Sequence, residues 1–240
     1  MGKGWMFRMG LTALLLIAFV VPLTAQGLEW VKANYTKHEY YIPMRDGVRL
    51  FTSAYIPKDR SQSYPILLDR TPYSCSPYGV DRFRENIGPA PAFPKEGYII
   101  VYQDVRGRWM SEGKFEHMRP HKDVKSGPKD IDEPTDTYDT IEWLLKNISG
   151  HNGRLGMWGI SYDGFYAAAG LVDAHPALKV VSPQAPVSDW FSSDDWHHNG
   201  AFLLAHAFGW FSGAGWEFTQ PTTVFPGRRI DIPTNDGYEF

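Results

Sequence analysis

One serine stands in a setting that favours nucleophilic chemistry. Ser161 lies in the segment Gly-Ile-Ser-Tyr-Asp-Gly at residues 159–164, where a strand-like apolar run at 154–158 meets a small-residue helical run at 165–172. A serine at a sharp strand-to-helix turn projects its Oγ above a sheet, and the first amides of the helix can stabilise an oxyanion. The segment therefore predicts acyl transfer with Ser161 as the nucleophile. An incidental serine in an ordinary strand–loop–helix turn is the alternative.

The elements that must position this serine alternate between strands and helices. Residues 136–147 have the apolar spacing of a helix, which Asp136 could cap, and Asp46-Gly47 favours a hairpin turn between two strands. We therefore predict an α/β fold, a mostly parallel sheet with helices on both faces and an antiparallel hairpin at its N-terminal start. The expected strands are 39–43, 48–56, 65–68, 98–102, 154–158 and 178–181, with a polar surface loop at 122–134 and an apolar helix at 201–210.

Five further motifs occur in order along the chain, and together with the serine segment they carry a family resemblance. Gly-x-Ser-Tyr-x-Gly resembles the X-Pro dipeptidyl-peptidase and cocaine-esterase group of α/β-hydrolases, which includes the α-amino-acid ester hydrolases. The resemblance covers about residues 35–215 and implies the α/β-hydrolase fold, although Asp163 stands where Gly-x-Ser-x-Gly would have its second glycine. The supporting motifs are Met-Arg-Asp-Gly-Val-Arg-Leu at 44–50, Arg-Thr-Pro-Tyr at 70–73, Gln-Asp-Val-Arg-Gly-Arg at 103–108 with Ser-Glu-Gly at 111–113, Asp-Thr-Ile-Glu-Trp-Leu at 139–144, and Gly-Met-Trp-Gly at 156–159.

The resemblance implies roles for four residues. Ser161 would be the nucleophile, and the backbone amide of Tyr162 and the phenol of Tyr73 would bind the oxyanion. Asp195 is the best match to an acid that helps hold a substrate's α-ammonium group, with Asp194 as the alternative. Tyr73 could instead be a packed aromatic residue, and Asp195 could belong to a solvated acidic turn. The implied substrate is an ester or amide of an amino acid or a short peptide, and no cofactor is expected.

The partners of the serine are not found where the group has them. The acid and the histidine would sit on loops after the last two strands, which the sequence does not contain, so we predict a fragment with little or no turnover by itself. His175 ends the helix after the serine and points away from the carboxyl edge of the sheet. A non-catalytic ligand-binding remnant is one alternative, and another is a small esterase that uses Asp189 or Asp195 with His198.

Charge and motif spacing weigh against two other classes of function. The chain has a formal net charge of −3 and no basic run, so a nucleic-acid partner is not expected. The cluster of acids and histidines at 194–198 lacks the spacing of the His-Glu-x-x-His zinc motif, so no metal site is predicted. Cys75 is the sole cysteine, which excludes an internal disulfide.

The chain divides into three segments. Residues 1–25 have the layout of a signal peptide: Lys3 and Arg8 precede an apolar run at 11–21, and small residues follow before Gln26. We expect a secreted or periplasmic protein with no membrane span once this segment is removed, and an uncleaved anchor is the alternative. Residues 26–188 are expected to form a partial α/β-hydrolase core, and residues 189–240 the beginning of a helical cap with an irregular tail.

Overall fold

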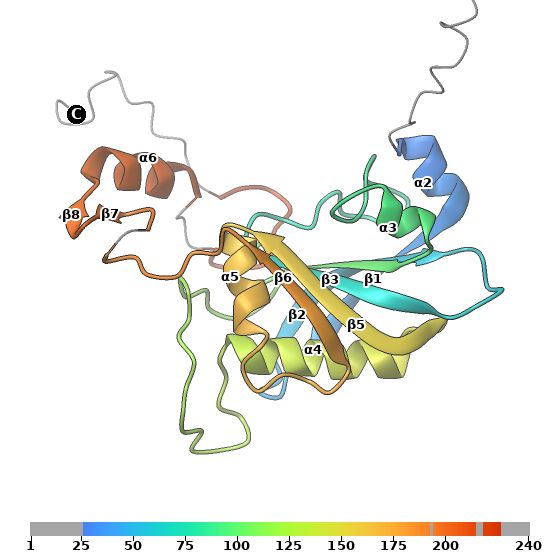
Figure 1. The fold of residues 1–240 in the computed structure, drawn as a ribbon, viewed down its shortest axis with the longest axis horizontal. Coiled ribbons are helices and arrows are strands. Elements are labelled where there is room, and N and C mark those ends of the chain that lie inside the picture. The colour runs from blue at the N-terminus through green and yellow to red at the C-terminus, as the bar shows by residue number, and fades with distance from the viewer. Residues whose placement is uncertain (1–25, 193, 215–217, 227–240) are drawn as a thin grey trace, which may run out of the picture.

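A six-stranded sheet forms the centre of the protein (Figure 1). The computed structural model describes residues 26–192, 194–214 and 218–226, so the predicted signal peptide lies outside the described residues. The strand order is β1-β2-β4-β3-β5-β6; the first two pairings are antiparallel and the other three are parallel. The strands are β1 (Tyr35–Pro43), β2 (Arg49–Pro57), β3 (Tyr64–Thr71), β4 (Ile99–Asp104), β5 (His151–Ile160) and β6 (Leu178–Gln184).

Helices cover both faces of this sheet. Helix α4 (Glu133–Asn147) packs its Ile141 and Leu144 against one face, and Val31 of α2 (Leu28–Asn34) packs against the other. Together with the hairpin of β1 and β2, this arrangement confirms the predicted mostly parallel α/β fold. The remaining elements are α3 (Ala92–Lys95), α5 (Tyr162–Ala169), β7 (His197–His198), β8 (Ala201–Phe202) and α6 (Leu204–Ala214).

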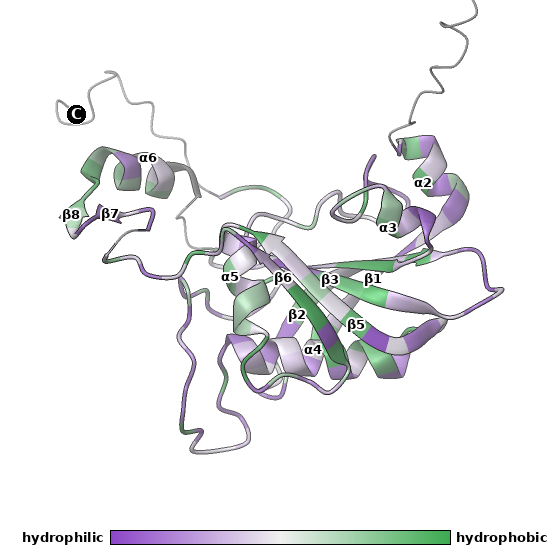
Figure 2. Ribbon diagram, in the orientation of Figure 1, coloured by the Kyte–Doolittle hydropathy of each residue, from purple (hydrophilic) through white to green (hydrophobic). Residues whose placement is uncertain are grey.

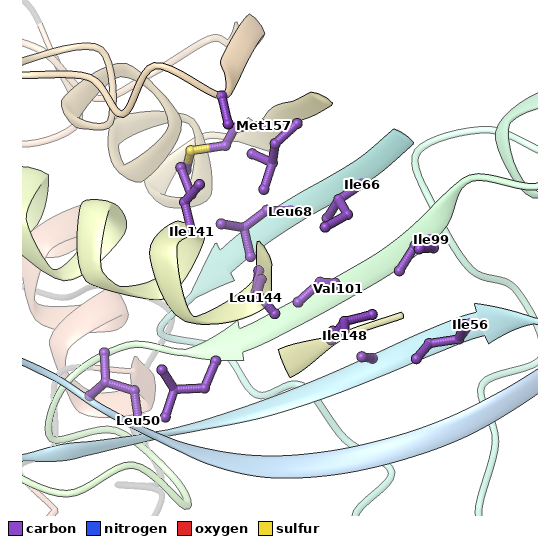
Figure 3. Packing of buried hydrophobic residues seen from close by; sticks show 14 of the residues in the cluster. Leu50, Ile56, Ile66, Leu68, Ile99, Val101, Ile141, Leu144, Ile148 and Met157 are labelled. Atoms are coloured by element: carbon purple, nitrogen blue, oxygen red, sulfur yellow. The ribbon is translucent and has the colours of Figure 1, made fainter. Parts of the chain in front are cut away.

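The alternation of side chains along the strands divides the core into two layers. Leu68 of β3 faces the helix α4 together with Val101 of β4, whereas their neighbours Leu67 and Ile100 belong to the layer on the opposite face. Figure 3 shows Ile141 and Leu144 of α4 projecting toward the layer that contains Leu68 and Val101. The inner strands β2 and β4 are buried along almost their whole length, as expected for strands covered on both faces, and Figure 2 shows hydrophobic residues within the sheet.

The N-terminus of α4 lies four residues before the one predicted. Asp132, not Asp136, is the N-cap: its carboxylate accepts the amide proton of Thr135, and the Thr135 hydroxyl accepts from the amide of Asp132. The first turn of a helix tolerates proline, so Pro134 does not prevent the helix from beginning at Glu133. The capping box of Asp132 and Thr135 then stabilises this earlier start. The predicted loop at 122–134 therefore ends at Asp132, and Asp136 is buried within the helix.

The predicted helix at 201–210 also begins later in the structure. Asn199-Gly200, with φ of 49° and 80°, forms a tight turn that pairs Ala201–Phe202 with His197–His198. An Asn-Gly pair with positive φ at both residues is the preferred turn of a two-residue hairpin. The chain therefore makes the small β7–β8 hairpin first, and α6 begins at Leu204.

A buried ionic network ties α4 to the strands that lead to the site. The guanidinium of Arg106 donates to both oxygens of Asp136, at 2.7 and 2.9 Å, and also to Asp46 in the β1–β2 turn. Arg70 of β3 is fully buried and donates to Thr137 of α4. Charges removed from water in this way are tolerated only because each is paired.

Replacing Arg106 with methionine is expected to lower the free energy of unfolding by about 3–5 kcal/mol, because it leaves the buried Asp136 without its closest partner. Urea denaturation of the two proteins would measure this difference. The matched control is Arg49→Met, which breaks the exposed pair with Glu112 and should lower the free energy of unfolding far less. Equal losses in the two variants would contradict the structural role of the buried network.

Candidate active site

The serine lies at a strained turn between β5 and α5. Ser161 has φ of 58° and ψ of −118°, a conformation that residues with a Cβ rarely adopt. Its N–H donates to the carbonyl of Gln184 on β6, and its own carbonyl accepts from Phe165 on α5, each at 3.0 Å. These two hydrogen bonds hold the turn from both sides, and the serine is exposed at the carboxyl edge of the sheet.

Two glycines make this tight turn sterically possible. A Cβ at Gly159 would stand 2.1 Å from the carbonyl oxygen of Asp163, and one at Gly164 would stand 2.8 Å from that of Gln184. Both glycines allow backbone approaches that no other residue permits. In the pattern Gly-x-Ser-x-Gly, the second glycine would stand at position 163. Asp163 causes no steric conflict there, because the close backbone approaches are made at Gly159 and Gly164.

The two residues predicted to supply the oxyanion donors, Tyr73 and Tyr162, pack against each other. Tyr162 is the first residue of α5, where a backbone amide has no acceptor within the helix. The ring of Tyr73 meets the ring of Tyr162 edge-on, with 6.2 Å between centroids, so the packing of Tyr73 places it beside the serine turn. The preceding carbonyl of Pro72 accepts hydrogen bonds from Arg108 and Trp109, which fixes the loop that carries Tyr73.

The phenol of Tyr73 keeps its proton. Burial raises the pKa of Tyr73, the nearby charge of Asp163 raises it further, and the nearby side chain of Trp210 acts in the opposite direction. An indole N–H can only donate, so Trp210 cannot accept the phenolic proton of Tyr73. The phenolic O–H therefore remains available to donate to another oxygen.

The side chain of Tyr162 has a structural role that the sequence analysis did not anticipate. Its hydroxyl accepts from the amide of Met118 at 3.0 Å, and its ring stacks on Tyr166 and on Trp210 of α6. The spacing of Tyr162, Phe165 and Tyr166 places all three on one face of a helix, and this signal could have revealed the aromatic cluster. The cluster connects the serine turn to the loop at 117–118 and to α6.

A pair of acids beneath the serine turn was also missed. Asp69 of β3 and Asp163 each have an Oδ1 atom that is buried without a hydrogen-bond partner. Burial raises the pKa of Asp163 to about 7, while burial and the charge of Asp163 raise the pKa of Asp69 well above its usual range. The nearby Thr71 side chain lowers the pKa of Asp163, and the Thr71 hydroxyl accepts from the amide of Tyr73, which links the acids to the oxyanion loop.

Replacing Asp163 with asparagine is expected to flatten the pH dependence of stability. The pKa of Asp163 is 3.8 when unperturbed and about 7 in the folded protein, so between these values the folded state binds protons that the unfolded state has lost. Stability therefore falls as pH rises through this range, and this loss should be smaller in the variant by about 1–3 kcal/mol.

Urea denaturation of both proteins at pH 5 and pH 8 measures this effect. Asp123→Asn is the matched control, because the side chain of Asp123 is almost fully exposed and its removal should leave the wild-type slope unchanged. A wild-type slope in the Asp163→Asn variant would show that this carboxyl titrates normally in the folded protein.

Asp195 lies in the segment that follows the sheet, near the candidate oxyanion site. It is exposed and lines a pocket of about 350 Å³ together with Asp194 and the histidines 197, 198 and 206. The charge of Asp195 contributes to the raised pKa of Tyr73, whereas Asp194 accepts hydrogen bonds from the amides of Ser188 and Asp195. The structure thus gives Asp194 a turn-stabilising role and leaves the carboxylate of Asp195 open to the pocket.

Within residues 26–192, 194–214 and 218–226, the Oγ of Ser161 has no hydrogen-bond partner. His175 contacts Glu142 and the amide of Ala177, at the far side of α4, so it does not approach the serine. His197 contacts the carbonyl of Trp190. Among the same residues, no group of three or more His, Cys, Asp and Glu side chains is arranged to hold a metal ion.

A model of the X-Pro dipeptidyl-peptidase (S15) family matches residues 46–224, three quarters of the chain. The chain belongs to this family. The S15 family match covers the hairpin turn at Asp46, the loop of Tyr73, the serine turn and the segment with Asp195. The strand order and the serine turn described above are thus those of an S15 family member.

Solved structures and a curated relative agree with the S15 assignment. The chain is 37% identical to an aminopeptidase from the marine sediment archaeon Thaumarchaeota archaeon, with a TM-score of 0.72 over 86% of this chain and 33% of that one. It is 38% identical to an α-amino acid ester hydrolase, with a TM-score of 0.67 over 85% of this chain and 33% of that one. Cocaine esterase from Rhodococcus sp. (strain MB1 Bresler) is 32% identical over 75% of this chain and 29% of its own length.

This S15 chain spans about a third of the length of these relatives. The α/β-hydrolase type of fold is shown by the first two structural matches, which cover most of the described residues. Across the described part of the chain, no helix is both long enough and apolar enough to cross a membrane.

Proposed function

We propose that Ser161 is the nucleophile of a serine hydrolase that acts on esters or amides of amino acids or short peptides. The observation that carries this proposal is the strained conformation of Ser161, exposed at the start of α5 with the Tyr162 amide and the Tyr73 ring beside it. Backbone strain of this kind persists only where the surrounding structure enforces it, and it concentrates at functional sites. The family membership supports the same chemistry.

The reaction would proceed through an acyl-enzyme. The Oγ of Ser161 attacks the substrate carbonyl while a general base takes its proton, and the carbonyl oxygen becomes an oxyanion. The Tyr162 amide and the Tyr73 O–H donate to this oxyanion. The tetrahedral intermediate collapses as the leaving group departs with a proton, and water then hydrolyses the ester formed on Ser161.

The carboxylate of Asp195 would select substrates with a free amino group. A carboxylate in a partly shielded pocket favours a nearby ammonium over a neutral group. Two similar structures are, by name, an aminopeptidase and an α-amino acid ester hydrolase, which supports an amino group on the substrate. A non-catalytic ligand-binding remnant is not favoured, because strain at Ser161 serves no purpose in a turn that only binds.

Localisation and domain boundaries extend this proposal. We propose that the protein is a secreted or periplasmic hydrolase, because residues 1–25 have a signal-like composition. Residues 26–188 would be the hydrolase core, and the β7–β8 hairpin with α6 would begin a cap over the serine.

The test uses the complete gene product. A fluorophosphonate probe should label one serine, which peptide mapping by mass spectrometry identifies as Ser161. The alanine p-nitrophenyl ester should be hydrolysed at least about tenfold faster than its N-acetylated form, because only the former has an ammonium group for Asp195. Labelling of another serine would overturn the assignment of Ser161 as the nucleophile. Equal rates with the two esters would overturn the role of Asp195.

A further inference from the structure

A second pocket opens beside Tyr73. It has a volume of about 550 Å³ and is lined by the loop from Tyr73 to Tyr78, by Arg82 and by Trp109. Residues 218–226 close it from another side, where the amide of Thr222 donates to the carbonyl of Trp109. Because Tyr73 lines this pocket, a substrate carbonyl bound by its phenol would have part of its structure within reach of the pocket.

The pocket presents one cation without a partner. Arg82 is exposed, and among the described residues its guanidinium has no hydrogen bond and no ion pair. The other arginine of this loop is already engaged: Arg84 donates to the carbonyls of Ser74 and Ser76 and lies over the ring of Tyr102.

The position of Arg82 is fixed by its backbone and by Gly79. The Arg82 amide donates to the carbonyl of Gly79 at 3.0 Å, and its Cγ and Cδ lie 3.6 Å from where a Gly79 Cβ would be. Gly79 is in turn bound to β1, since its amide donates to Glu39 and its carbonyl accepts from Lys37. The guanidinium therefore extends from a turn that is anchored to the sheet.

Nearby acids leave this charge uncompensated. Asp104 lies under the pocket, but its carboxylate is buried and accepts from the Tyr78 hydroxyl and from the amides of Cys75 and Met110. Asp81 is the exposed neighbour of Arg82 in sequence, and the two side chains do not form an ion pair. A guanidinium with unused donors in a polar pocket is suited to a carboxylate.

The geometry points to a carboxylate subsite: we propose that Arg82 binds the free carboxylate on the leaving group of an amino-acid or short-peptide substrate. This inference rests on the proposed function. Arg82 lines the same pocket as Tyr73, and the opposite charge of Asp195 acts on Tyr73 from a second pocket, so a substrate with an ammonium at one end and a carboxylate at the other complements the two charges. The substrate class is thereby narrowed to short peptides with a free C-terminus.

Binding to the complete gene product with Ser161→Ala tests this subsite without turnover. Isothermal titration would compare the dipeptide alanyl-phenylalanine with its C-terminal amide. We expect the free acid to bind about 10–100-fold more tightly than the amide, and this preference should shrink as NaCl is raised. Arg82→Gln should remove the preference, and Arg82→Lys should keep part of it.

Arg154→Gln is the matched control, because Arg154 is an exposed arginine on β5 outside the pocket, and this variant should keep the wild-type preference. Equal affinity for acid and amide would overturn the subsite, as would a preference that survives Arg82→Gln. Hydrolysis of the alanine p-nitrophenyl ester by the protein with Ser161 intact tests the proposed function separately, since that ester has no carboxylate. Failure of the hydrolase proposal and failure of the subsite therefore give different results.

Discussion

Replacing Ser161 with alanine in the complete gene product is expected to lower kcat/KM for the alanine p-nitrophenyl ester by about 10⁴-fold or more. Without the Oγ, no acyl-enzyme can form, and the oxyanion donors and substrate contacts alone provide only a small residual rate. Stopped-flow or steady-state measurement of p-nitrophenolate release gives the rate. Labelling by the fluorophosphonate probe should disappear in the same variant.

The control variant for this prediction is Ser149→Ala. Ser149 is an exposed serine just before β5, at the opposite end of the strand that leads to Ser161, so its hydroxyl is remote from the serine turn. Both variants should keep the thermal transition of the wild type within a few degrees. A Ser161→Ala protein that retains a tenth of the wild-type rate would contradict the assignment of the nucleophile.

Replacing Tyr73 with phenylalanine is expected to lower kcat by about 10²–10³-fold with little change in KM. The variant keeps the ring that packs against Tyr162 and loses the hydroxyl, which would donate to the oxyanion and which also lies near Trp210. An interaction made mainly in the transition state affects kcat rather than ground-state binding. Steady-state kinetics on the same ester separate these two parameters.

The alternative for Tyr73 predicts a different result. If this residue acts only as a packed aromatic, phenylalanine preserves its contacts and the rate stays near that of the wild type. Tyr41→Phe is the matched control, because Tyr41 is a partly exposed tyrosine on β1 that meets Phe51 edge-on. Its loss of a hydroxyl should not change kcat.

The fold was largely predictable because local signals agreed with the tertiary structure. The Asp46-Gly47 turn gave the hairpin, and the β-branched run at 99–101 gave a strand buried on both faces. The serine turn was predictable because Gly159 and Gly164 bracket it at positions where a side chain would collide with backbone. The strand ends were less well predicted, since hydrogen bonding to neighbours extends β5 and β6 beyond their apolar residues.

The parts of the site that were missed depend on contacts between distant segments. Nothing local to Asp69 or Asp163 indicates that two acids, 94 positions apart, share one buried region. The start of α4 was misplaced for a similar reason: Asp136 has a capping residue type, but its carboxylate is committed to Arg106. Polar residues with two plausible partners can be assigned only when the fold decides which partner is near.

Trp210 of α6 contacts the side chains of both tyrosines of the candidate oxyanion site. Its side chain influences the pKa of Tyr73 and stacks on the ring of Tyr162, although α6 follows the sheet and the small hairpin in the chain. A shift of α6 would therefore affect the phenol of Tyr73 and the ring of Tyr162 together, whereas the Tyr162 amide belongs to the first turn of α5. Variants of α6 should therefore change reaction rate and substrate preference together. Substitutions that adapt this helix to a new substrate would also lower the turnover rate if they displace Trp210.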